Sequence, residues 1–196
     1  MLTIESGDTV AVESLLYFIR HAQSVYVEGK ERTRGLSEQG INDAYKIRDL
    51  LRAEDIDIFV SSPYERAIGT IRLLASEQGR KIHREEDLRE RKMGDFTPAT
   101  FLEAKCHLFE DFNKSFPNGE SSKVAQRRAI AVIKSYMAKN QGKKIGIGTH
   151  GDIMTLMLND YDKQYGYSFW KSTTMPDIYK VRLAGNEIIE VMRMWE

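Results

Sequence analysis

Two short apolar runs, each followed by a histidine, constrain the fold of this chain more than any other feature. Residues 15–19 read Leu-Leu-Tyr-Phe-Ile and precede Arg20 and His21, while residues 145–149 precede His150. A continuous apolar run of this length is typical of a strand buried on both faces, as in a parallel sheet. Because open α/β sheets bind ligands beyond the carboxyl ends of their strands, the two histidines are candidates to meet at one sheet edge. The alternative is that each is an ordinary core or loop histidine with a hydrogen-bond partner.

Strand and helix patterns alternate along the rest of the chain. The pattern predicts strands at 15–19, 57–61, 81–83 and 145–149, helices at 37–55, 62 onward, 101–112, 121–140 and 153–158, an irregular loop at 160–177, and a terminal hairpin of 178–183 and 188–194. This order predicts an α/β fold: a single-domain three-layer sandwich over residues 1–196, with a mixed, mostly parallel sheet and helices on both faces. Residues 93–120 are interpreted as a small cap insertion over the sheet edge. Residues 1–14 are predicted to form a loose arm or a short edge strand.

A helix start directly follows the strand at 57–61. The segment Ser62-Pro63-Tyr64-Glu65 fits a capping box with proline at the first helical position. Such a helix end offers free N–H groups and a partial positive charge to an anion, and Arg66 adds a full charge one turn in. The alternative is that Arg66 covers its helix surface. The basic residues of the loop at 23–35, Lys30, Arg32 and Arg34, and the mixed-charge run at 84–92 are interpreted as solvated.

The charge balance and the single cysteine indicate which partners and which compartment to expect. The chain has 196 residues with 29 Lys and Arg against 29 Asp and Glu, so nothing favours a nucleic acid or an acidic membrane as partner. Cys106 stands alone, which rules out an intrachain disulfide and fits a reducing compartment. No apolar run approaches the roughly 20 residues of a membrane span, and the start lacks a signal-peptide pattern. We therefore expect a soluble cytoplasmic protein.

If the three strand ends converge, Arg20, His21, Arg66, His150 and a helix N-terminus share one site. This set suits a tetrahedral dianion, above all a phosphoryl group, because guanidinium forks match phosphate oxygens in pairs. The sequence has no metal-ligand spacing and no glycine-rich nucleotide loop, so we expect neither a metal nor a nucleotide. A neutral imidazole can act as nucleophile in phosphoryl transfer, and the leaving alcohol then needs an acid. The residues alone do not identify that acid.

Six short motifs occur in an order that resembles one family. They are Arg20-His21-Ala22-Gln23-Ser24, Leu36-Ser37-Glu38-Gln39-Gly40, Ser61-Ser62-Pro63-Tyr64-Glu65-Arg66-Ala67 with Thr70, Leu88-Arg89-Glu90 with Gly94, Gly119-Glu120-Ser121, and Thr149-His150-Gly151. Together they resemble the motifs of the histidine phosphatase superfamily, the phosphoglycerate mutase-like group, over about residues 15–155. No single motif is specific, but six in family order are.

The resemblance implies a role for individual residues and implies no metal or organic cofactor. His21 would be the nucleophile that forms a phosphohistidine, and Glu90 would protonate the leaving group and then activate water. The groups implied to hold the phosphoryl oxygens or to lie beside them are Arg20, Arg66, His150, Gln23, Ser24 and Gly151. Two positions depart from the family pattern: Ala22 replaces the usual glycine, and Val27 stands where many members carry an asparagine that contacts phosphate.

The short segment after Glu90 favours one branch of the family. Because the mutases of this group tend to carry a longer insertion there, we predict a histidine acid phosphatase-like enzyme that hydrolyses a phosphate monoester without a metal. Its substrate would be a small-molecule phosphate ester or a phosphorylated protein. The alternatives are mutase-type phosphoryl transfer and, because of Val27, a non-catalytic phospho-ligand or protein-binding member. The natural substrate and the oligomeric state do not follow from the sequence.

Overall fold

A six-stranded sheet runs through the structure, a computed structural model that describes residues 13–185 and 187–196. The strands are β1 (Glu13–Arg20), β2 (Ile58–Ser61), β3 (Ile82–Arg84), β4 (Lys144–Thr149), β5 (Asp177–Ala184) and β6 (Glu187–Arg193). Their order is β3-β2-β4-β1-β5-β6. The first four are parallel, and the β5–β6 hairpin adds antiparallel to β1. The predicted mixed, mostly parallel sheet is therefore confirmed.

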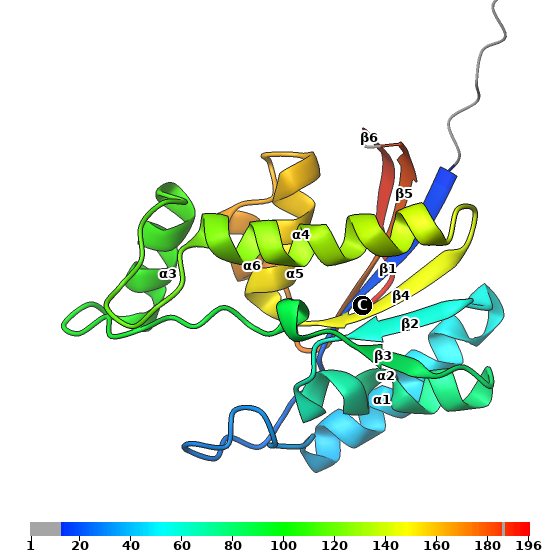
Figure 1. The fold of residues 1–196 in the computed structure, drawn as a ribbon. Helices are drawn as coiled ribbons and strands as arrows, with labels where there is room; N and C mark the ends of the chain where they lie inside the picture. The colour runs from blue at the N-terminus through cyan, green and yellow to red at the C-terminus, as the bar shows by residue number, and fades with distance from the viewer. Residues whose placement is uncertain (1–12, 186) are drawn as a thin grey trace, which may run out of the picture.

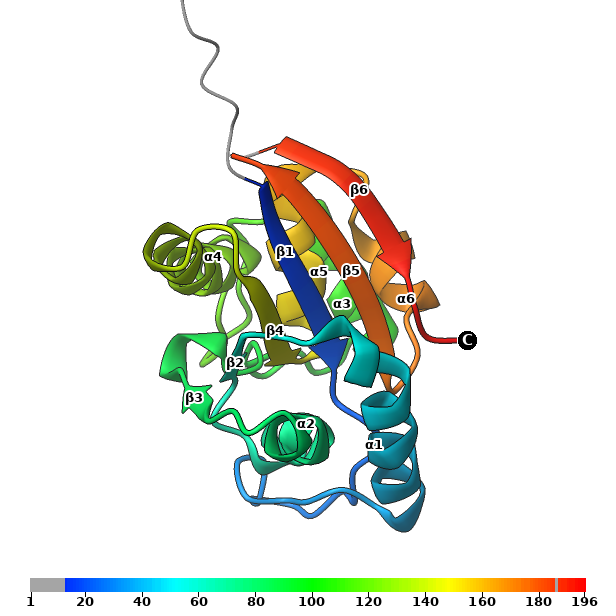
Figure 2. The same ribbon diagram turned by 90° about the vertical axis from the view of Figure 1, so that its right-hand side faces the viewer.

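Helices cover both faces of this sheet, so the molecule has three layers (Figures 1 and 2). Helices α1 (Glu38–Leu51) and α2 (Glu65–Glu77) lie on one face. The other face carries α4 (Ser122–Lys139), α5 (Gly151–Tyr161) and α6 (Tyr167–Ser172), while α3 (Phe101–Glu110), in the predicted cap segment, lies away from the strands and contacts α6. Two short 3-10 turns, η1 (Arg52–Glu54) and η2 (Glu86–Leu88), complete the described elements. Among the described residues, no helix has both the length and the apolar character that crossing a bilayer requires.

The side chains of β1 alternate between the two faces of the sheet, and both faces are buried, which explains why the run is apolar throughout. Leu16 and Phe18 belong to the hydrophobic cluster beneath α4 and α5, whereas Tyr17 and Ile19 belong to the cluster beneath α1 and α2. Successive strand residues point to opposite faces, so a strand covered on both sides must be apolar throughout. The prediction of a doubly buried strand is confirmed.

The parallel register between β1 and β4 brings the two histidines to one edge. Arg20 pairs with Thr149, and the His21 amide donates to the Thr149 carbonyl at 2.9 Å. Strand β2 ends at the same level, because the Ser62 amide donates to the Gly148 carbonyl at 3.0 Å. The loops after β1, β2 and β4 therefore leave the sheet side by side.

Several predicted elements differ from the observed ones in their boundaries or in kind. The predicted capping box at Ser62 is wrong: α2 begins at Glu65, and its N-cap residue Tyr64 makes no side-chain cap. The segment predicted as an irregular loop contains the helix α6, and the helix predicted at 153–158 is longer at both ends, since α5 runs from Gly151 to Tyr161. Glu13 and Ser14 open β1, while residues 1–12 lie outside the described part of the chain.

Candidate active site

A cleft of about 750 Å³ opens at the sheet edge where β1 and β2 end. Its lining includes five residues predicted from the sequence, namely His21, Gln23, Ser24, Arg66 and Glu90. Arg20, His150 and Gly151 are not among its lining residues. The structure thus brings the predicted residues into one neighbourhood but divides them into a set that faces the cleft and a set beneath it.

His21 faces the cleft as a neutral imidazole whose orientation is fixed. It is only 6% exposed, and its Nδ1 lies 2.8 Å from the Ala22 carbonyl oxygen. Because a carbonyl only accepts, this contact assigns the proton to Nδ1 and leaves a lone pair on Nε2. The Arg66 Nε donates to that Nε2 at 3.2 Å. Burial lowers the pKa of His21 to about 3, with Arg66 and other guanidinium groups adding to the effect, so the ring is uncharged at neutral pH.

Arg66 is buried beside His21 because it is the second residue of α2. Its side chain is 3% exposed, its Nη1 donates to the Glu31 carbonyl at 2.6 Å, and its Cζ lies 4.8 Å from the Tyr64 ring centroid. Burial lowers the pKa of Arg66, but a guanidinium starts so high that it stays charged. The alternative that Arg66 merely covers its helix surface is wrong. Tyr64, which the sequence offered only as part of a cap, forms one wall of this arginine site.

His150 lies directly beneath His21. The two ring centroids are 5.2 Å apart in an edge-on arrangement, and His150 is fully buried. Its Nε2 is 2.7 Å from the Ser62 hydroxyl oxygen, while its buried Nδ1 has no hydrogen-bond partner among the described residues. Burial together with the nearby His21 and Arg66 lowers the pKa of His150 well below its usual value. Ser62 therefore holds a histidine rather than capping a helix.

Arg20 lies beneath the cleft, outside its lining, and its guanidinium group is hydrogen-bonded to Thr173. Its Nη1 donates to the Thr173 carbonyl at 3.2 Å and also contacts the Thr173 hydroxyl. The guanidinium lies against the backbone at Gly151, where an added Cβ would be 2.9 Å from the Arg20 Cζ. Glycine is needed there because the two groups pack so closely. The Arg20 Nε is buried and lacks a hydrogen-bond partner in the described structure, which leaves it free for an acceptor.

The loop between β1 and α1 adds to the cleft a basic residue that the sequence pattern predicts to be solvated. Arg34 lines the cleft with a side chain only 16% exposed, and its Nη2 lies 3.1 Å from Glu31 Oε2. That same carboxylate oxygen lies 3.5 Å from Arg66 Nη1, so one anionic oxygen reaches both guanidinium groups. The interpretation of this loop as solvated is correct for Arg32 and wrong for Arg34. Val27, in contrast, is exposed and does not line the cleft.

Gln23 and Ser24 form the rim that this loop shares with α1. The Ser37 hydroxyl donates to Gln23 Oε1 at 2.7 Å, and Ser24 pairs with Leu36 in an isolated antiparallel bridge. Ser37 also caps α1 as predicted, because it accepts from the Gly40 amide at 3.1 Å. A Cβ on Gly40 would overlap the Gln23 carbonyl oxygen, so glycine at this position lets the rim approach the helix.

Glu90 enters the cleft from the segment after η2. The Arg91 amide donates to its Oε1 at 2.9 Å, and the Asp152 amide, at the start of α5, donates to its Oε2 at 3.3 Å. Burial raises the pKa of Glu90, and the nearby Asp152 carboxylate raises it further. A carboxyl group in this setting keeps its proton to higher pH than an exposed one and can act as a proton donor.

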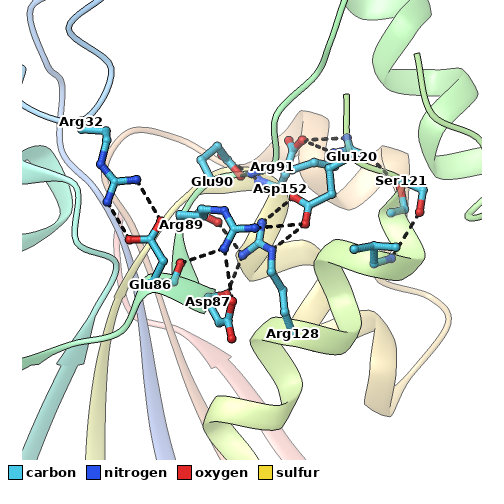
Figure 3. A network of polar contacts seen from close by, with 12 residues as sticks. Arg32, Glu86, Asp87, Arg89, Glu90, Arg91, Glu120, Ser121, Arg128 and Asp152 are labelled. Atoms are coloured by element: carbon cyan, nitrogen blue, oxygen red, sulfur yellow. Dashed lines mark hydrogen bonds and ion pairs between the residues drawn. The ribbon is translucent and has the colours of Figure 1, made fainter. Parts of the chain in front are cut away.

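Two groups of contacts fix the segment that carries Glu90, as Figure 3 shows. Arg128 forms a bidentate pair with Glu120, both N–O distances being 2.7 Å, and also donates to the carbonyl groups of Asp87 and Arg89. On the other side, Arg91 pairs with Asp152 in the protein interior. The interpretation of the mixed-charge run at 84–92 as solvated is wrong for Arg91, which is buried.

The described residues contain no group of three or more His, Cys, Asp or Glu side chains placed to hold a metal ion. The arrangement supplies a fixed neutral imidazole, guanidinium groups next to it and a carboxyl group with a raised pKa. Guanidinium charge stabilises the oxygens of a transferring phosphoryl group, an imidazole lone pair can attack phosphorus, and a carboxyl group can protonate the leaving oxygen. The geometry therefore suits phosphoryl transfer through a histidine.

Comparisons with known proteins agree with this chemistry. A model of the histidine phosphatase superfamily (branch 1) matches residues 16–186. A 2,3-bisphosphoglycerate-dependent phosphoglycerate mutase from Pseudoalteromonas atlantica is 25% identical, over 87% of this chain and 95% of the relative. Two solved structures share the fold: a mycobacterial glucosyl-3-phosphoglycerate phosphatase (TM-score 0.72, 20% identity, 92% and 97% of the two chains) and a phosphoglycerate mutase from Bacillus anthracis (TM-score 0.69, 19% identity, 94% and 94%).

Proposed function

Since the chain belongs to the histidine phosphatase superfamily, branch 1, we propose that it is a metal-independent phosphomonoester hydrolase that acts through a phosphohistidine on His21. The observation that carries this proposal is the contact between His21 and Arg66 in the cleft. It leaves a neutral ring with its Nε2 lone pair beside a buried guanidinium. An incoming phosphoryl group would take the place of the imidazole as the acceptor for Arg66.

In the first step, the lone pair on His21 Nε2 forms a bond to phosphorus while the bond from phosphorus to the ester oxygen breaks. Glu90 transfers its proton to that oxygen, so the leaving group departs as a neutral alcohol. In the second step, the Glu90 carboxylate takes a proton from water, and the water oxygen bonds to phosphorus as the N–P bond breaks. Inorganic phosphate leaves, and both side chains return to their starting forms.

The cations around the cleft would hold the phosphoryl oxygens. Arg66 and Arg34 already share one carboxylate oxygen of Glu31, which supports a role for Arg34 beside the residues carried over from the family. Arg20 would contribute its unpartnered Nε, and His150 its unpartnered Nδ1. Gln23, Ser24 and the backbone at Gly151 complete the proposed phosphate site.

The cleft volume of about 750 Å³ favours a small-molecule phosphate ester over a phosphorylated protein, because it falls in the range of small-molecule sites. We place this activity in the cytoplasm, in line with the single cysteine of the chain. Mutase activity is the second candidate, since a mutase is a relative over nearly its full length. Conversion of 3-phosphoglycerate to its isomer in the presence of a bisphosphate primer would favour it.

The deciding experiment is to trap the covalent intermediate. The protein is incubated with a chromogenic aryl phosphate in the presence of a metal chelator, quenched at alkaline pH and analysed by mass spectrometry for phosphate on His21. We expect turnover and a labelled His21, both lost in His21→Ala and retained in His83→Ala, which removes an exposed histidine on β3. Turnover that needs a divalent metal and survives His21→Ala would contradict the proposal. Phosphate binding with no labelled His21 and no turnover would favour a non-catalytic phospho-ligand protein.

A further inference from the structure

Three charged side chains are buried together behind Glu90. Arg91, Asp152 and Lys105 have side chains that are 0%, 1% and 5% exposed. Arg91 Nε and Nη2 lie 2.9 and 2.7 Å from Asp152 Oδ2, and the Lys105 ammonium contacts the same oxygen. The residues come from the segment after η2, the first turn of α5 and the cap helix α3. Their charges sum to one positive charge in the interior.

Burying such a cluster costs free energy of folding unless good geometry and further hydrogen bonds offset the lost hydration. Removing charges from water is expensive, and well-packed apolar residues often give equal or better stability than a buried ion pair. Asp152 Oδ1 also has no hydrogen-bond partner in the described structure, so the cluster is not fully satisfied. Stability alone is therefore a weak reason for these residue types at these places.

The cluster is joined to Glu90 through the backbone. The two amides that donate to the Glu90 carboxyl group belong to Arg91 and Asp152, at 2.9 and 3.3 Å. The side chains of these same two residues are paired, as Figure 3 shows. Because each side chain restrains its own backbone, the ion pair holds both amides in register with the carboxyl group between them.

The cluster is joined to the cap through α3 at two points. Lys105 reaches Asp152 from this helix, and Arg91 Nη1 donates to the Ser122 hydroxyl at 2.6 Å, which in turn donates to the Leu108 carbonyl of α3. Lys105 also lies over the Phe101 ring, 5.1 Å from its centroid. Both Phe101 and Lys105 line the cleft. The position of the cap helix and the position of Glu90 therefore depend on the same carboxylate.

We propose that Arg91, Asp152 and Lys105 are positioning residues for Glu90. These three residues couple the orientation of the Glu90 carboxyl group, the proton donor, to the position of the cap helix α3. This rests on the proposed function, in which Glu90 protonates the leaving group. Lys105 is the link that the cap supplies. Without it, Asp152 keeps Arg91 as its partner but loses its contact with α3.

The charged groups that face Glu90 predict the direction in which its titration moves when one of them is removed. They are Asp152 from α5, Lys105 from α3, Arg66 from α2 and Arg20 from β1. Removing Lys105 leaves Asp152 less compensated, which disfavours ionised Glu90 and moves its titration to higher pH. Removing the Asp152 charge leaves only cations, which moves the titration to lower pH. Opposite shifts would show that both charges act on Glu90 itself, and the leaving-group dependence then tests whether they position it.

The test compares substrates that need a proton donor with substrates that do not. Activated aryl phosphates leave without protonation, whereas alkyl phosphates require it, and general acid catalysis is worth about 10²–10⁴-fold. We expect Lys105→Met to lose about tenfold or more in kcat/KM for an alkyl phosphate and under threefold for an activated aryl phosphate. The alkaline limb of the pH profile of kcat/KM should move to higher pH in Lys105→Met and to lower pH in Asp152→Asn. Lys114→Met, an exposed cap lysine beside Phe116, is the matched control.

A second measurement does not depend on turnover. Hydrogen exchange of the α3 amides should be faster in Lys105→Met than in the unaltered protein and unchanged in Lys114→Met. Should Lys105→Met fail to fold, Lys105→Gln, which keeps a polar side chain, replaces it. A folded Lys105 variant with unaltered leaving-group dependence, alkaline limb and α3 exchange would overturn the proposal. Failure of Glu90→Gln to show that leaving-group dependence would instead overturn the proposed role of Glu90, and the exchange measurement would still test the tie to the cap.

Discussion

The cleft has a floor, at the ends of β1, β2 and β4, and a rim, formed by loops and the cap. Both carry arginines, but these arginines lie in opposite environments. On the floor, Arg66 is 3% exposed and contacts His21 directly. On the rim, Arg32 is 54% exposed and forms a bidentate pair with Glu86, with N–O distances of 2.9 and 2.6 Å. Burial lowers the pKa of Arg66, whereas the hydrogen bonds that Arg32 donates to Glu86 raise the pKa of Arg32. The same residue type is thus desolvated in one region and solvated in the other.

This difference shows which guanidinium groups can interact strongly with a bound anion. A buried guanidinium that shares one carboxylate with a second guanidinium, as Arg66 shares Glu31 with Arg34, interacts strongly with an incoming anion, because solvent does not screen it. A surface ion pair is worth about 0–1 kcal/mol and is weakened by salt. The floor is built from the ends of β1, β2 and β4, and the rim from loops and the cap. We therefore expect the floor to determine catalysis and the rim to tune substrate choice.

The strongest way to break this comparison is to remove the floor arginine. Arg66→Ala should lower kcat by about 10²–10³-fold, the range for loss of one preorganised donor to a transition state. Arg66→Lys should recover little, because an ammonium does not reproduce the fork that contacts both His21 and the phosphoryl oxygens. Steady-state kinetics with an aryl phosphate measure both. Arg72→Ala, which removes an exposed arginine from the same helix, is the control. Equal losses in the two variants would contradict the assignment of Arg66 to the floor.

The pH dependence tests the two titrating groups of the site. In the proposed mechanism, activity requires neutral His21 and protonated Glu90. Because the pKa of His21 is lowered to about 3, kcat/KM should fall on the acid side only as the pH drops toward 3. Because the pKa of Glu90 is raised, activity toward an alkyl phosphate should persist above the usual carboxyl range and fall as the pH rises through it. Glu90→Gln should cost about 10²–10⁴-fold and abolish the alkaline limb. A half-maximal acid limb near pH 6.5 would show that His21 is not desolvated as described.

Arg34 lies between the two regions, since it belongs to a rim loop but is mostly buried. Arg34→Ala should raise KM about tenfold, the effect of losing ~1.4 kcal/mol of binding, with a smaller change in kcat. Val27→Asn, which introduces the residue common in the family, should change KM much less, because Val27 is exposed and outside the cleft lining. Inhibition constants for inorganic phosphate measure the same loss without turnover. An effect of Val27→Asn larger than that of Arg34→Ala would contradict this placement.

The smallest effect is expected at the rim ion pair. Arg32→Ala should change kcat by less than about fivefold, in keeping with the small energy of an exposed pair, and its effect should shrink at high salt. Measurement of KM over a range of ionic strength for several phosphate esters sharpens the comparison. A change that differs between esters would mark Arg32 as a specificity residue, whereas a large uniform loss of kcat would place it with the floor.

The apolar runs before His21 and His150 determined where these two residues lie. A strand buried on both faces has a distinct local pattern, and parallel strands end at the same edge, so the sequence predicts both histidines at one sheet edge, as candidates to meet. That they do meet follows from the strand order, which makes β1 and β4 neighbours. The Ser37 cap and the terminal hairpin follow from local chemistry as well. The motif order gave the family, which the match over residues 16–186 bears out.

The burial of charge was decided by the tertiary structure. Arg91 stands in a run of charged residues that reads as solvated, yet it is buried because Asp152 and Ser122, 61 and 31 positions away, provide its partners. Ser62 carries the signature of a helix cap, yet it holds His150. A sequence pattern reports the average polarity of a segment, whereas the cost of burying a charge depends on groups that only folding brings next to it. For that reason the proposed nucleophile could be predicted from the chain, and the residues proposed to position the proton donor could not.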